Sequence, residues 1–79
     1  MLMENKFLNV AIIAGNVHQL RQAANLSQSE LAKLIHVSKS SINAWERGHT
    51  YPNLINVLSI CNYFKVKVDD LIGVSSMKR

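Results

Sequence analysis

The stretch that decides the fold of this chain is residues 27–48, SQSELAKLIHVSKSSINAWERG. Its apolar residues recur at the three- and four-residue steps of a helix, first over 31–35 and again over 42–45. Ser27 with Glu30 forms a capping-box pattern before the first run, and Ser38 can cap the second. The pattern therefore predicts two short helices joined by a tight turn. The side chains predicted to point inward are Leu31, Ala32, Ile35, Val37, Ile42 and Trp45.

The second of these helices has a polar face opposite its buried side, which carries Lys39, Ser40, Asn43 and Ala44. In a helix-turn-helix, such a face enters the major groove of DNA. Lys39 can donate to guanine or to a phosphate, Asn43 can pair with adenine, and the Ala44 methyl can meet thymine. Ser40 can donate or accept at either base or phosphate. We expect these four residues to contact bases; the alternative is an ordinary solvated helix face.

Polar residues at the edges of the two helices are candidates for phosphate contacts. Gln28 stands at the first turn of the first helix, where free backbone N–H groups also favour a phosphate oxygen. The alternative role for Gln28 is helix capping alone. The remaining candidates are Ser38, Arg47, His49 and Thr50.

Composition limits the class of protein. The 79 residues are 48% hydrophobic and 18% charged, which fits one small globular domain, and the net charge of +4 favours a polyanionic partner. The one cysteine, Cys61, excludes an internal disulfide framework and fits a reducing, cytoplasmic setting. His18, His36 and His49 lack other ligands at metal-binding spacing, so we expect neither a metal nor a cofactor. We also expect no signal peptide and no membrane span.

The rest of the chain completes an all-α, compact five-helix domain over 9–73, with an arm at 1–8 and a tail at 74–79. The first helix is predicted to end near Ala24, and Gly15 is an alternative start. A fourth helix is predicted after Asn53, and a last short turn over 68–72. The predicted stripe of the first helix is Val10, Ile13, Val17, Leu20 and Ala24, and that of the fourth is Leu54, Val57, Leu58, Cys61 and Phe64.

Over residues 17–72, the sequence resembles the phage repressor and Cro type of helix-turn-helix regulators, the XRE family, in the identity, order and spacing of the matching residues named below. The resemblance implies operator binding as a two-fold dimer, recognition by the start of the third helix, and a buried ion pair between Arg21 and Glu46. The matching residues are Leu20, Arg21, Leu26, Ser27, Gln28, Leu31, Ala32, Val37, Ser38, Ile42, Trp45, Glu46, Arg47, Gly48, Pro52, Leu58, Phe64, Val66, Asp70 and Leu71.

The chain departs from that family pattern at two helix ends. His36 and Lys65 stand where the family usually has glycine, and both positions are expected to need a positive φ. Asn25 stands at a third helix end, where asparagine tolerates the left-handed region. Lys67 replaces the usual hydroxyl cap before the last turn, so we expect that turn to fray.

The expected function is sequence-specific binding of double-stranded DNA by a transcriptional regulator, a repressor acting as a homodimer on a palindromic operator. The alternatives are the antitoxin or autoregulator of a toxin–antitoxin pair, and a protein-interaction adaptor that does not bind DNA. No residue constellation supports catalysis, so we do not expect an enzyme. The candidates for the dimer interface are Ile55, Tyr63, Ile72 and Val74 first, and Phe7 and Leu8 second.

Overall fold

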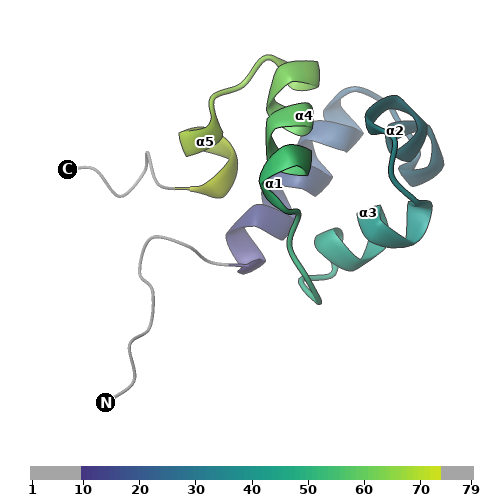
Figure 1. Ribbon diagram of the computed structural model, residues 1–79, viewed down its shortest axis with the longest axis horizontal. Coiled ribbons are helices and arrows are strands. Elements are labelled where there is room, and N and C mark those ends of the chain that lie inside the picture. Colours follow the sequence, from purple (N-terminus) through teal and green to yellow (C-terminus); the bar gives the residue numbers. More distant parts are fainter. Residues whose placement is uncertain (1–9, 74–79) are drawn as a thin grey trace.

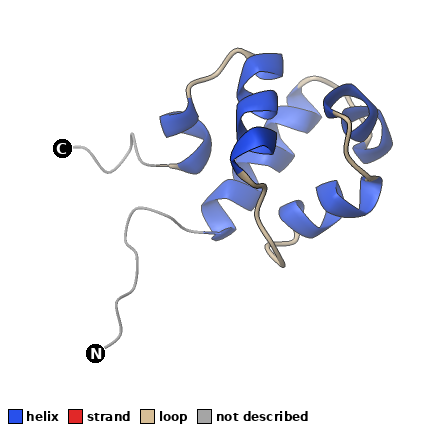
Figure 2. Ribbon diagram, in the orientation of Figure 1, coloured by secondary structure: helices blue, strands red, loops and turns tan. Residues whose placement is uncertain are grey.

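The computed structural model describes residues 10–73, and over this range the chain forms five helices and no strand (Figures 1 and 2). The all-α, five-helix prediction is confirmed. Helix α1 begins at Val10, so the alternative start at Gly15 is wrong. Phe7, Leu8 and Val74 lie outside the described residues. The helices are α1 (Val10–Ala23), α2 (Gln28–Ile35), α3 (Lys39–Glu46), α4 (Leu54–Phe64) and α5 (Val68–Ile72).

Side-chain caps fix where three of the helices begin. Ser27 Oγ accepts a hydrogen bond from the backbone N–H of Glu30 at 2.9 Å, and the Glu30 carboxylate accepts one from the Ser27 N–H at 2.7 Å. Ser38 and Asn53 each accept a hydrogen bond from the backbone N–H three residues further on. Lys67, before α5, makes no side-chain cap bond. The predicted capping box and the predicted Ser38 cap are confirmed.

Three helix-end residues other than glycine adopt the left-handed conformation. His36 ends α2 with φ 62° and Lys65 ends α4 with φ 60°, while Asn25 after α1 has φ 58°. Gly48, one residue beyond the end cap of α3, also has a positive φ, 74°. The positive φ angles predicted for His36, Lys65 and Asn25 are confirmed, and the fold keeps the sharp chain reversals at these positions without glycine.

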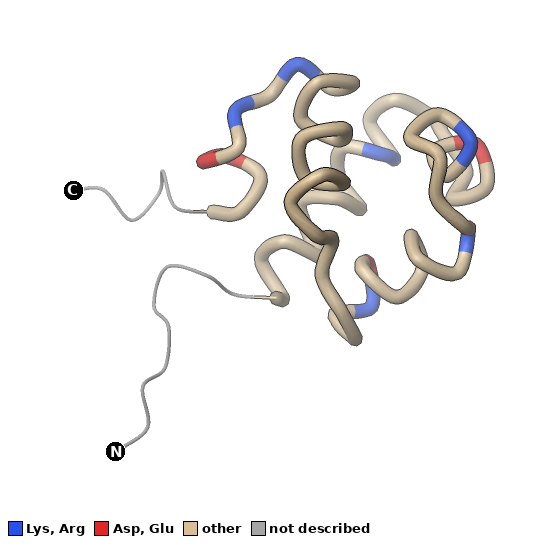
Figure 3. The backbone as a smooth tube through the Cα atoms, in the orientation of Figure 1, with Lys and Arg blue, Asp and Glu red and all other residues tan. Residues whose placement is uncertain are grey.

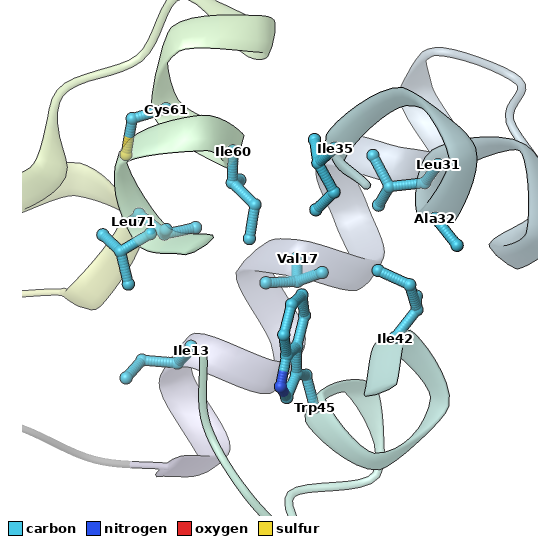
Figure 4. Packing of buried hydrophobic residues seen from close by; sticks show 11 residues of the cluster. Ile13, Val17, Leu31, Ala32, Ile35, Ile42, Trp45, Ile60, Cys61 and Leu71 are labelled. Atoms are coloured by element: carbon cyan, nitrogen blue, oxygen red, sulfur yellow. The ribbon is translucent and has the colours of Figure 1, made fainter. Parts of the chain in front are cut away.

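Helix α1 carries the centre of the core. It packs against α3 and α5, while α2 packs against α3 and α4 (Figure 1). Figure 4 shows Val17 of α1 in the middle of the labelled side chains, with Trp45 and Ile42 of α3 on one side of it. All of the side chains predicted to point inward from the helix-turn-helix are buried except Val37, which is half-buried and packs on the core.

The predicted stripe of α4 is wrong at two positions. Leu54 and Leu58 are 69% and 49% exposed, whereas Ile60, which the stripe omitted, is fully buried. The reason is that α4 is apolar on nearly every side, so spacing alone does not identify the buried face. Ala24 is likewise exposed, because α1 ends one residue before it.

Candidate nucleic-acid interface

The polar side of α3 is held at the surface because its opposite side belongs to the core. Ile42 and Trp45 anchor α3 against α1 and α2, which leaves Lys39 and Ser40 exposed and Asn43 and Ala44 half-buried. A shallow polar depression lies at the start of α3. Its lining residues are Gln28, Lys39, Ser40 and Asn43.

An ion pair between α1 and α3 lies below this surface. Arg21 Nε donates to Glu46 Oε2 at 2.6 Å, and Arg21 Nη2 donates to Oε1 at 2.9 Å, a bidentate geometry. The Arg21 and Glu46 side chains are 13% and 5% exposed. Arg21 Nη1 also donates to the backbone oxygen of Leu26 at 2.8 Å, so one guanidinium joins α1, the loop before α2, and α3.

The electrostatics keep Glu46 ionised. Burial would raise the pKa of Glu46, but hydrogen bonds from Arg21, His18 and Gln28 and the Arg21 charge outweigh burial and hold it below its ordinary value. The hydrogen bond with Glu46 raises the pKa of Arg21 in turn. At neutral pH the Glu46 carboxylate therefore only accepts hydrogen bonds.

His18 belongs to this ion-pair cluster, which the sequence analysis missed. Its Nδ1 lies 3.0 Å from Glu46 Oε1 and 3.3 Å from Arg21 Nη2. The available signal was its position three residues before Arg21, which puts both side chains on one face of α1.

Gln28 connects the buried carboxylate to the outer face of α3. Its Nε2 donates to Glu46 Oε1 at 3.2 Å, and its Oε1 accepts a longer hydrogen bond from Asn43 Nδ2 at 3.4 Å. The Gln28 amide therefore has a protein partner on each side, a connection that the sequence analysis did not predict.

The other predicted phosphate contacts flank α3 at its two ends. Ser38 is exposed, and its hydroxyl serves as the α3 cap and also bonds the Ser41 hydroxyl at 3.0 Å. Arg47, His49 and Thr50 are exposed beyond the other end. Figure 3 shows basic positions at both ends of α3 and none along α4.

Within residues 10–73 there is no group of three or more histidine, cysteine or acidic side chains placed to hold a metal ion. None of the helices in that range combines the length and the apolar character needed to cross a membrane. Cys61 is buried in the core, and burial raises its pKa, as does the nearby charge of Asp70.

The sequence is similar to those of a transcriptional activator and of an antitoxin. The HTH-type transcriptional activator BcrR of Enterococcus faecalis is 39% identical over 57 residues, which cover 72% of this chain and 28% of BcrR. Antitoxin PezA of Streptococcus pneumoniae is 29% identical over 66 residues, covering 84% of this chain and 42% of PezA. The chain thus spans less than half the length of either relative.

A solved structure is also similar to this chain. The P22 c2 repressor, crystallised with a synthetic operator, superposes with a TM-score of 0.74 at 27% identity, covering 78% of this chain and 94% of the repressor chain. A family model described as helix-turn-helix matches residues 17–71, most of the sequence. The chain belongs to this helix-turn-helix family, that of the phage repressor and Cro-type transcriptional regulators.

Proposed function

We propose that this chain binds a palindromic operator as a homodimer, with α3 in the major groove, and represses transcription there. The observation that carries the proposal is the polar depression at the start of α3, where Gln28, Lys39, Ser40 and Asn43 converge above a buried ion pair. Because the other side of α3 is fixed in the core, its outer face is presented on a rigid support.

The side chains divide by chemistry into two groups. Lys39, Ser40, Asn43 and Ala44 can reach base edges, which carry the sequence information. The flanking residues would bind phosphates, which set the position of the domain on the duplex. The proposed phosphate ligands are Ser38, Arg47, His49 and Thr50, together with the free backbone N–H groups at the start of α2, beside Gln28.

The dimer interface that we propose is the exposed face of α4, formed by Leu54, Ile55 and Leu58. Ile55 is 72% exposed, and the α4 sequence LINVLSICNYF contains no charged residue. A two-fold interface brings a surface against its own copy, and an uncharged apolar face is self-complementary in that arrangement. Of the other interface candidates, Tyr63 is exposed and Ile72 is half-buried.

Sedimentation of the wild type and of Ile55→Ser tests this interface. We expect a concentration-dependent dimer for the wild type and a monomer for the variant at the same concentration. A wild type that stays monomeric at high concentration, with and without operator DNA, contradicts the homodimer.

Repression is the simplest regulatory outcome of this geometry, because an occupied operator excludes other proteins without further contacts. The relative BcrR is named as an activator, so transcription from a reporter with the selected operator decides the sign. The second candidate is an antitoxin, which the similarity to PezA favours. The family is a class of DNA-binding regulators, and we propose no enzymatic reaction.

Selection of bound duplexes from a random pool tests DNA recognition. We expect Ser40→Ala to change the preferred sequence and Arg47→Ala to weaken binding to all duplexes. Loss of one cation should also lower the slope of log affinity against log salt by about one. A wild-type chain without salt-dependent duplex binding would refute the proposal and favour a protein-interaction adaptor.

A further inference from the structure

A line of hydrogen bonds runs from the buried ion pair to the exposed face of α3. It begins at Glu46 Oε1, passes through the Gln28 side chain and ends at Asn43. Each step has a defined direction. An ionised carboxylate has no proton to give, so Gln28 must point its Nε2 toward Glu46 and its Oε1 away from it.

The direction of the first bond fixes that of the second. Because Oε1 is turned toward α3, Gln28 can only accept a hydrogen bond from Asn43. Asn43 Nδ2 donates that bond, at 3.4 Å. Asn43 then keeps one N–H donor and its Oδ1 acceptor for another partner. A donor beside an acceptor is the pattern that adenine requires in the major groove, at N7 and N6.

We propose that Gln28 is a positioning residue for base recognition. The Glu46 carboxylate fixes the orientation of the Gln28 amide, and Gln28 in turn fixes that of the Asn43 amide, so that Asn43 specifies adenine at one operator position. This proposal rests on the DNA-binding function proposed above. It assigns the Gln28 side chain to specificity, whereas the sequence analysis assigned it to a phosphate.

Selection experiments with Gln28→Met distinguish the two roles, because methionine keeps the side-chain length and removes the amide. We expect Gln28→Met and Asn43→Ala to reduce discrimination at the same base pair, by about 5- to 150-fold, and the double variant to lose little more. Arg47→Ala serves as the reference for a phosphate contact. The unfolding midpoint of each variant provides the control for folding.

Two results would overturn the proposal. Gln28→Met could weaken all duplexes equally and keep the base preference, as expected of a phosphate ligand. Alternatively, it could relax a different base pair from Asn43→Ala, which would show that Gln28 reads a base itself. If the wild type selects no sequence at all, the proposed function fails, and the measurement below decides the amide orientation alone.

Asn43→Asp tests the orientation without DNA. The new carboxylate cannot donate to Gln28 Oε1, so we expect the variant to lower the unfolding midpoint more in the wild-type background than in the Gln28→Met background. The repulsion from Glu46, three residues along α3, is present in both backgrounds and cancels in the comparison. Equal losses in the two backgrounds would show that Gln28 does not set the orientation of Asn43.

Discussion

The exposed faces of α3 and α4 differ in chemical character, since the first is polar and the second is apolar. That of α3 carries hydroxyl and amide groups with basic residues at either end, whereas α4 exposes Leu54, Ile55 and Leu58 and has no charge. Water solvates the first face well, but exposed apolar area on the second is unfavourable by about 25 cal/mol per Å². The comparison indicates two kinds of partner, a polar duplex for α3 and an apolar surface for α4.

The support under each face also differs. The α3 face rests on a charged cluster in which Glu46 accepts from Arg21, His18 and Gln28. The α4 face rests on apolar packing through Val57, Ile60 and Cys61. Polar support fixes the direction of side-chain groups, which base recognition needs, while apolar packing fixes only position.

The largest expected effect comes from breaking the charged support. Arg21→Ala and Glu46→Ala should each lower the free energy of unfolding by about 3 to 5 kcal/mol, because each leaves a charge buried without its partner. The double variant should lose less than the sum of the two. Denaturant unfolding checks this, with Glu30→Ala as the reference for an exposed carboxylate, expected to cost about 0.5 to 1.5 kcal/mol through loss of its capping-box hydrogen bond. Two small and additive losses would mean that the pair is solvated.

Substitutions on the buried side of α4 should cost much more stability than substitutions on its exposed face. Ile60→Ala is expected to cost about 2 to 5 kcal/mol, because it opens a cavity in the core. Leu58→Ala, on the same helix, should change stability by about 0.5 kcal/mol or less at a protein concentration that keeps the chain monomeric. Similar losses for the two variants would place Leu58 in the core, as the sequence pattern predicted.

The same contrast explains what sequence reasoning could find. In α3, the apolar residues Ile42 and Trp45 are three positions apart and polar residues fill most of the other positions, so the helical period identifies both faces. In α4, Leu58 and Ile60 have the same hydrophobic character, and only packing against α2 and α5 decides which is buried. The connection of Gln28 to Glu46 spans 18 residues and depends on the crossing of two helices, which no local pattern contains.

The smallest expected effect on stability comes from the left-handed residues at the ends of α2 and α4. Lys65→Gly at the end of α4 should stabilise the protein by about 0.5 to 1 kcal/mol, because relief of left-handed strain exceeds the added entropy of the unfolded chain. His36→Gly at the end of α2 should gain less, since histidine enters this region more readily than lysine.

Asn25→Gly is the matched control for these two variants, with φ 58° close to the values of 62° and 60° at His36 and Lys65. Asparagine tolerates the left-handed region, so this change should be neutral or slightly destabilising. We therefore expect the thermal unfolding temperatures of the three variants to follow the order Lys65→Gly, His36→Gly, Asn25→Gly, from most to least stabilised. A clear loss of stability at His36→Gly would show instead that the histidine side chain makes a contact at the turn between α2 and α3, and that this contact outweighs the strain.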